Sequence, residues 1–245
     1  SFTPYTWRFP LVGEVPYKGF FSRKRAEVEY NKLSSQGYDV LLRPVSAYST
    51  LGHLSDPLLS TMLSYPPHVL TDLILHELTH ATMYAKGHTD FNESVATFIG
   101  QEGARQFLNR HYGKDNPYLR NALEEKRDRE RFRFFIKDLT QTLDSLYQAS
   151  TNSPELLNKR KQVFNQAQKR FKKTLPLYTN QGYEAFLNWE INNARLLSYR
   201  RYNSKQDAFH RIHDNLEADL SQSISLFSQC CETEDPWRCL DSHDK

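Results

Sequence analysis

Hydrophobic positions recur at helical spacing along most of this chain, and the exceptions lie near its N-terminus. Residues 1–21 are rich in proline, glycine and aromatic side chains without a helical period, which predicts irregular structure with short extended pieces. Ser22 is placed to cap a helix that ends at Gly37. The β-type residues from Tyr38 to Tyr48 are interrupted by Pro44, which predicts an edge strand.

The next segments predict a short helix and two buried helices. Asp56-Pro57 opens the short helix, which ends near Leu63. Pro66-Pro67 then fits a helix start and Lys86-Gly87 a stop, and the helix between them is apolar nearly all round. Residues 91–113 form the second buried helix.

The C-terminal half predicts further long helices. Residues 117–150 and 154–173 are typical of an antiparallel helical hairpin. A helix is expected at 183–202, and a capping box at 204–207 opens a last helix that reaches Cys230. The side chains expected at the hairpin seam are Leu119, Leu123, Phe134, Leu139, Leu143 and Leu146.

These elements predict an α+β fold that is predominantly helical, with a small edge-strand sheet and a projecting helical hairpin. Residues 1–116 would form the core, 117–174 the charged hairpin, and 175–245 the helices that complete the core, with a cysteine-containing tail.

Composition excludes some classes of protein. A net charge of +3 over 245 residues gives no bulk electrostatic case for nucleic acid. No apolar run approaches the ~18 residues needed to span a membrane. The chain begins at Ser1 without methionine, so we expect a processed or truncated form.

The three cysteines lie close together near the C-terminus. Cys239 could pair with Cys230 or with Cys231, which would suit an oxidising compartment, or all three could be free thiols.

The candidate chemistry centres on His76-Glu77-Leu78-Thr79-His80. Residues four apart on a helix share one face, so both imidazoles can reach one ion. Glu77 projects toward the same side and can act as general base. This His-Glu-x-x-His pattern is typical of zinc hydrolases, in which the ion activates water and polarises a carbonyl. We therefore expect one Zn²⁺ per chain.

A catalytic zinc needs a third protein ligand, and the next helix offers Glu93. Glu93 shares its helix face with small residues, which let two helices approach closely. Glu102 points about 180° away. His88 and Asp90, with Glu102, remain alternatives.

Other segments suggest substrate and partner contacts. An edge strand beside the metal helix could pair with a peptide backbone, which makes Val45, Ser46, Ala47 and Tyr48 candidate substrate contacts. On the 183–202 helix, Asn192, Arg195, Tyr199 and Tyr202 share a stripe. Either tyrosine could donate to an oxyanion, although a buried hydrogen-bond layer is the plainer interpretation.

Residues 159–173 carry seven positive side chains and no negative one. They form either a solvated face or a surface for anionic lipid or another acidic partner.

Six segments span most of the chain outside the hairpin and the tail: TWRFPLVGEVPYKGFF, GYDVLLRPVSAYSTLG, DPLLSTML, HELTH, FNESVATFIGQEG and NNARLLSYRRY. Together they resemble the predicted aminopeptidase family of Gram-negative bacteria. The resemblance implies a zincin-like peptidase with ligands His76, His80 and Glu93 and Glu77 as base. It also implies that Tyr48, Ser49, Thr50, Asn192, Asn193 and Tyr202 belong to shared motifs near the site.

Members of that family begin with a lipoprotein-type signal, which implies a periplasmic, membrane-anchored protein of which this chain is a cut form. Many relatives have cysteines at the positions of Arg8 and Glu14. We therefore expect a zinc-dependent peptidase acting on peptides, an aminopeptidase by resemblance. The alternatives are an endopeptidase of the cell envelope and a non-catalytic metal-containing binding protein. Membrane contact would come from the basic hairpin or a lost lipid anchor.

Overall fold

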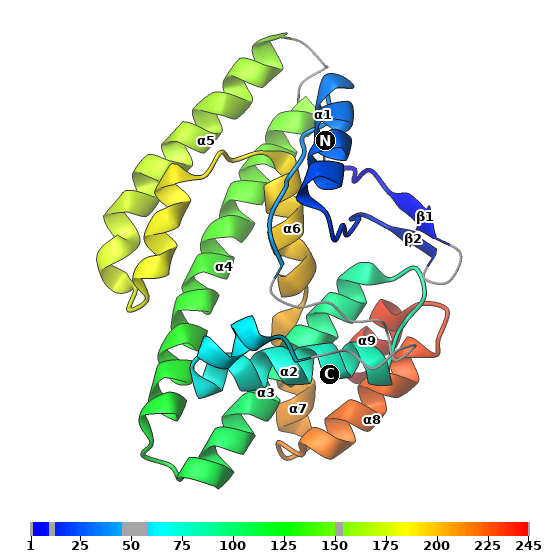
Figure 1. The fold of residues 1–245 in the computed structure, drawn as a ribbon, viewed down its shortest axis with the longest axis vertical. Coiled ribbons are helices and arrows are strands. Elements are labelled where there is room, and N and C mark those ends of the chain that lie inside the picture. Colours follow the sequence, from blue (N-terminus) through cyan, green and yellow to red (C-terminus); the bar gives the residue numbers. More distant parts are fainter. Residues whose placement is uncertain (1, 10–12, 46–57, 150–153, 245) are drawn as a thin grey trace. The chain divides into compact units, whose positions relative to one another are not determined.

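The computed structural model describes residues 2–9, 13–45, 58–149 and 154–244 (Figure 1). Within these residues the chain is mostly helical, with one small antiparallel sheet, which confirms the predicted predominance of helix. No helix of the described part is both long and apolar enough to cross a membrane. The elements in chain order are β1 (Trp7–Phe9), β2 (Gly13–Val15), α1 (Arg23–Ser35), the 3-10 helix η1 (Ser60–Ser64), α2 (Pro67–Thr82), α3 (Thr89–Tyr112), α4 (Pro117–Ala149), α5 (Pro154–Thr174), the 3-10 helices η2 (Leu175–Leu177) and η3 (Gln181–Asn188), α6 (Asn193–Asn203), α7 (Gln206–Asn215), α8 (Leu220–Cys231) and α9 (Pro236–His243).

The chain divides into two compact units, each built from separated segments. Unit 1 contains Ser1–Pro4, Glu27–Leu41 and Leu123–Leu197, and unit 2 contains Tyr5–Ala26, Leu42–Ala122 and Ser198–Lys245.

Unit 1 is organised around aromatic side chains of α4, α5 and η3. The Phe132 ring lies 5.4 Å from Phe171 and 5.5 Å from Phe186, and Trp189 packs against Phe186 at 5.3 Å between ring centroids. The predicted seam of the hairpin is partly wrong. Leu139 and Leu143 are buried, but Leu123 and Phe134 are exposed because the buried face of α4 runs through Phe132 instead.

The sheet lies within residues 1–21, where short extended pieces were predicted, and not at the predicted edge strand. In the described part of the chain, β1 and β2 are the strands, and their register places Arg8 directly opposite Glu14. The predicted strand at 38–45 is not formed. In place of a strand partner, the side-chain amide of Asn192 donates a hydrogen bond to the Val40 carbonyl at 3.1 Å. The remainder of that prediction, residues 46–48, lies outside the described residues.

Unit 2 has a continuous apolar core. Its buried side chains come from α3, α7, α8 and α9 and from the turn between α2 and α3: Met83, Ala85, Phe91, Val95, Phe98, Ile99, Ala208, Phe209, Ile212, Phe227, Cys230 and Leu240. The prediction that α3 is buried is confirmed. The prediction for α2 is wrong in part, because most of its side chains are half-buried and Leu78 is 55% exposed.

Two predicted helices are broken. The expected 183–202 helix divides into η3 and α6, and Asn192 caps α6 by accepting from the Arg195 amide at 3.0 Å. The expected 204–230 helix divides into α7 and α8 because Glu217 and Ala218 adopt positive φ angles of 56° and 58°. Helix α2 also ends at Thr82, before the predicted stop.

The proposed capping box is absent as well. Ser204 Oγ donates back to the Arg200 carbonyl, and no side chain caps α7 at Lys205. The cap that does form is at the next helix, where Asp219 accepts from the amides of Ser221 and Gln222.

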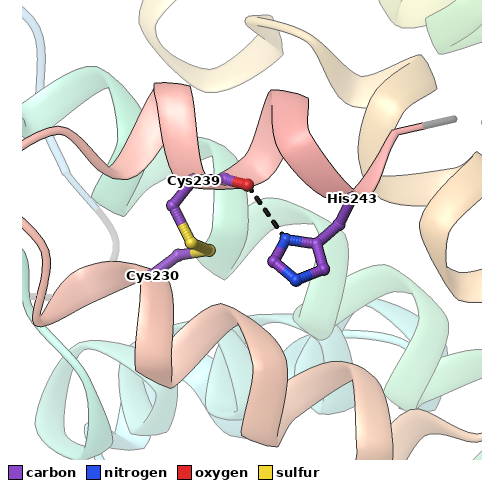
Figure 2. A group of neighbouring side chains, drawn as sticks. All are labelled: Cys230, Cys239 and His243. Atoms are coloured by element: carbon purple, nitrogen blue, oxygen red, sulfur yellow. Dashed lines mark hydrogen bonds between the residues drawn. A yellow bond between two sulfur atoms is a disulfide. The ribbon is translucent and has the colours of Figure 1, made fainter.

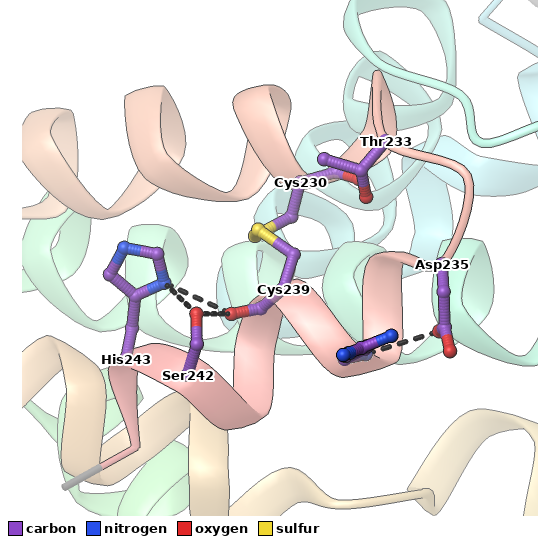
Figure 3. The surroundings of a disulfide bond; sticks show 7 residues. Cys230, Thr233, Asp235, Cys239, Ser242 and His243 are labelled. Atoms are coloured by element: carbon purple, nitrogen blue, oxygen red, sulfur yellow. Dashed lines mark hydrogen bonds between the residues drawn. A yellow bond between two sulfur atoms is a disulfide. The ribbon is translucent and has the colours of Figure 1, made fainter.

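A disulfide joins α8 to α9. Cys230 and Cys239 form the bond, and Cys231 is the free thiol (Figure 3). This agrees with the expectation that Cys239 pairs with Cys230 or Cys231. Burial raises the pKa of the Cys231 thiol to about 12, so this side chain is an unreactive thiol at neutral pH.

Candidate metal centre

Helix α2 presents two histidines on one face. His76 and His80 lie one turn apart, and their Nε2 atoms approach to 3.2 Å. The helix begins at Pro67, where a missing amide hydrogen costs no intrahelical hydrogen bond. Because residues four apart on a helix share one face, the regular helix directs both imidazoles toward one point.

Helix α3 brings a carboxylate to the same point. Glu93 Oε2 lies 3.5 Å from the Nε2 atom of each histidine. Glycine allows this approach: a Cβ added at Gly100 would lie 2.9 Å from the backbone oxygen of Asp72 on α2. The expectation that small residues on the Glu93 face let α2 and α3 pack closely is confirmed.

The three donor atoms fit a tetrahedral metal ion. Ligands about 2.0–2.2 Å from zinc in tetrahedral geometry are separated by ~3.3 Å, and the observed separations are 3.2–3.5 Å. The side chains of His76, His80 and Glu93 are 17%, 10% and 7% exposed. Two imidazoles and one carboxylate are also a donor set that zinc uses. We call these three residues the His-His-Glu cluster.

The electrostatics of the cluster favour a cation at its centre. Burial raises the pKa of Glu93, but hydrogen bonds and charge from His76 and His80 outweigh burial and lower this pKa to about 2. Burial lowers the pKa of His76, but Glu93 and the nearby charges of Glu77 and Asp72 raise it above its ordinary value. The carboxylates thus create a site that attracts positive charge, whether protons or a metal ion.

Two tyrosines lie close to the Glu93 carboxylate. Tyr17 donates its hydroxyl hydrogen to Glu93 Oε1 at 3.3 Å, which leaves Oε2 facing the histidines. Burial and the charge of Glu93 raise the pKa of Tyr17 and of Tyr84, so both remain protonated at neutral pH. The Arg201 guanidinium lies over the Tyr17 ring at 5.1 Å. Hydrogen bonds of this kind orient a metal ligand and fix which oxygen is offered.

Tyr202 is the tyrosine of the predicted stripe that reaches the cluster. Its ring centroid lies 6.1 Å from that of His76, and its oxygen accepts a hydrogen bond from Arg43 Nη2 at 3.3 Å. Burial raises the pKa of Tyr202, and the charge of Glu93 adds to this effect. The phenol is therefore protonated, and its hydrogen remains available as a donor.

The other predicted site residues are less closely tied to the cluster. Glu77 is half-buried beside His76, and its charge contributes to the raised pKa of that histidine. Tyr199 is half-buried one turn before Tyr202, and its carbonyl accepts from Asn203. The roles of Glu77 and Tyr199 stay predictions.

Asn192 and Asn193 belong to unit 1, where they have structural partners. Asn192 bonds to the Val40 carbonyl, and Asn193 accepts from Tyr147 while its amide donates to Asp39. Val45 is exposed, whereas the substrate-binding candidates Ser46, Ala47, Tyr48 and Ser49 lie outside the described residues.

The alternative third ligands have other partners. Glu102 binds Arg105 and Gln106, and its Oε1 lies 3.4 Å from His213. His88 contacts the Glu234 carbonyl, and Asp90 pairs with Arg201. These contacts leave Glu93 as the carboxylate that meets both histidines.

A second group has donor atoms close enough for an ion, but not in a usable state. Cys230, Cys239 and His243 lie together, as Figure 2 shows. The two sulfur atoms are joined to each other, so they offer no thiolate. His243 Nδ1 instead contacts the Cys239 carbonyl at 3.0 Å. We assign this group a structural role.

Sequence reasoning missed Tyr17, Tyr84 and Arg43. Tyr17 and Arg43 fall within segments that carried the family resemblance, but no local period marks either as a site residue. The signal available was only that a buried glutamate beside two histidines requires a hydrogen-bond donor on its second oxygen.

Fold and site together define a mostly helical protein with a buried His-His-Glu cluster, the donor set of mononuclear metal-dependent hydrolases. The chain belongs to the family described as "Putative aminopeptidase", whose model matches residues 1–238. The family name indicates peptidase activity on peptide substrates. No curated protein and no solved structure gives a significant match to this chain.

Proposed function

We propose that this protein is a zinc-dependent peptidase and, following its family, an aminopeptidase of zincin-like design. The observation that carries this proposal is the convergence of His76 Nε2, His80 Nε2 and Glu93 Oε2 at 3.2–3.5 Å in a buried setting. One zinc ion per chain would be held by these three side chains.

Zinc in this position would lower the pKa of a water molecule toward ~7 and polarise the substrate carbonyl. Glu77 accepts the proton of the attacking water and delivers it to the leaving amine. Its place between the two histidines on α2 puts its charge near His76, where it already acts on that imidazole.

Tyr202 is our candidate donor to the oxyanion that develops during attack. Its oxygen accepts from Arg43, so its own hydrogen can point toward the substrate. Its raised pKa keeps that hydrogen in place at neutral pH. Tyr17 acts as a positioning residue, because it holds Oε1 of Glu93 and leaves Oε2 for the ion.

The donor set also bears on the non-catalytic alternative. Structural zinc sites are closed by four protein ligands, often cysteines. In the described residues the cluster supplies three donors, and the cysteines near the C-terminus belong to another group. A three-ligand set supports catalysis over a structural metal. Endopeptidase activity would use the same chemistry and remains the alternative in substrate choice.

The location we propose is the periplasmic side of the cell envelope. The Cys230–Cys239 disulfide supports an oxidising compartment, because such bonds rarely persist in a reducing cytosol.

The test pairs zinc content with peptide cleavage in the wild type and Glu77→Gln. Glutamine keeps the size of the side chain but cannot take up a proton at neutral pH. Zinc content should stay near one per chain, and turnover should fall by ~10²–10⁴, the usual contribution of a general base. Glu234→Gln, a matched change at an exposed glutamate, should leave both measurements unchanged.

Equal turnover by the wild type and Glu77→Gln would refute Glu77 as the base. A zinc-loaded wild type that cleaves no member of a broad peptide set would favour the binding-protein alternative.

A further inference from the structure

An exposed guanidinium contacts Tyr202, the tyrosine next to the His-His-Glu cluster. Arg43 contacts Tyr202 twice: Nη2 donates to the phenol oxygen at 3.3 Å, and the guanidinium carbon lies 5.8 Å from the ring centroid. Arg43 is exposed, and no carboxylate pairs with it within the described part of the chain. The neighbouring Arg201, by contrast, is buried and lies 3.8 Å from Asp90.

Tyr202 connects this guanidinium to the cluster. Its ring centroid is 6.1 Å from that of His76 and 5.8 Å from the guanidinium carbon of Arg43, so Arg43 lies at most about 12 Å from the His76 ring. An extended peptide advances ~3.3–3.6 Å per residue. A peptide bond placed at the cluster would therefore bring groups within about three residues of it to the reach of Arg43.

The chemistry of this position favours an anion. Arginine presents a planar fork of N–H donors that matches a carboxylate, and it stays charged at all relevant pH values. One Nη2 contact to a neutral phenol uses only part of that fork. An exposed cation at the edge of a site also attracts anionic substrates over longer distances.

We propose that Arg43 is a specificity residue that binds a substrate carboxylate within about three residues of the scissile bond. This inference rests on the proposed peptidase function and adds a substrate class to it. The carboxylate has two possible sources, the C-terminus of a short peptide or an acidic side chain. Both present the same group to the guanidinium, so substrates must distinguish them.

The experiment uses three substrates of equal length. Tetra-alanine carries a terminal carboxylate three residues beyond the first peptide bond, tetra-alanine amide carries none, and Ala-Asp-Ala-Ala amide carries one only on the side chain next to that bond. We would measure kcat/KM for the zinc-loaded wild type, Arg43→Gln and Arg43→Lys. Arg238→Gln, which removes an exposed arginine of the same unit, serves as the matched control.

The wild type should prefer at least one carboxylate substrate over the neutral amide by about tenfold or more, the order of one charged hydrogen bond. Arg43→Gln should bring this ratio close to one, chiefly through KM. Arg43→Lys should restore part of the ratio, since it keeps the charge but loses the fork. Arg238→Gln should keep the wild-type ratio. The substrate with the higher ratio identifies the source of the carboxylate.

Two outcomes would overturn the proposal while leaving the peptidase function intact. One is a wild type that cleaves the amide as well as both carboxylate substrates. The other is an Arg43→Gln enzyme whose kcat falls equally on all three substrates, which would show that Arg43 only positions Tyr202. A wild type that cleaves none of the three would refute the proposed function and this proposal with it.

Discussion

The close approach of α2 and α3 predicts that one added methyl group at Gly100 weakens the metal centre. In Gly100→Ala the new Cβ would lie 2.9 Å from the Asp72 backbone oxygen and 3.4 Å from the His76 Cβ, where ordinary contacts are 3.4–4 Å. The Asp72 oxygen belongs to the backbone and cannot rotate away, so the two helices must separate by about 0.5 Å to relieve the contact. Metal sites tolerate only ~0.2 Å in ligand distance, so zinc affinity should fall by about tenfold or more.

The effect on stability can be bounded. Overpacking costs ~1–3 kcal/mol, and alanine gains ~1 kcal/mol over glycine inside a helix. Gly100→Ala should therefore lower the free energy of unfolding by about 0–2 kcal/mol. At Gly103 the new Cβ would lie 2.7 Å from the end of the Leu75 side chain, which can rotate aside, and at an ordinary contact distance of 3.6 Å from Leu220. That rotation costs ~0.5–1.5 kcal/mol, so Gly103→Ala should be nearly neutral.

The assay combines urea unfolding of the zinc-free protein with zinc titration against a competing chelator. Gly19→Ala is the control, because a Cβ there meets no described atom within 4 Å. Our prediction is that Gly100→Ala is the weakest zinc binder and the least stable of the three variants. A Gly100→Ala protein that matches Gly103→Ala in both measurements would refute it.

Three further predictions concern other contacts. Tyr17→Phe should weaken zinc binding by ~10–100-fold in the same titration, because it removes the hydrogen bond to Glu93; an unchanged affinity would deny Tyr17 its positioning role. Replacing both Cys230 and Cys239 with serine should lower the free energy of unfolding by ~2–4 kcal/mol, read from urea curves, and an unaltered midpoint would show that the bond adds no stability. The basic arm at 159–173 should bind anionic vesicles at low salt and lose this binding when its lysines become glutamate; absence of vesicle binding by the wild type would exclude the membrane role.

The part of the site that local spacing controls could be predicted from the sequence. The two histidines share a face because they are one helical turn apart, and no tertiary information is needed for that. Glu93 could be selected because the glycine and alanine on its face indicated a close helix contact, which Gly100 makes. Tyr17 could not be found in this way, since it lies 76 residues from Glu93 and meets it only through the fold.

The errors in the fold also have physical causes. The α7–α8 break requires positive φ at Glu217 and Ala218, which their side chains give no reason to expect. Asp219 followed three residues later by Gln222 is a sequence pattern typical of a helix start, and it could have predicted that α8 begins there. The strand expected near Val40 is not formed, because strand propensity alone does not supply a neighbouring strand to pair with. The Val40 carbonyl accepts a hydrogen bond from the side-chain amide of Asn192 instead.

The measurement that tests the central claim most directly is the zinc content of purified wild type, Glu93→Gln and Glu102→Gln by elemental analysis. Both variants replace a buried carboxylate on α3 with an amide of the same size, but only Glu93 faces the two histidines. Our prediction is about one zinc per chain in the wild type and Glu102→Gln, and a loss of zinc in Glu93→Gln, because amides are poor zinc ligands. Zinc retained by Glu93→Gln, or lost from Glu102→Gln alone, would contradict it.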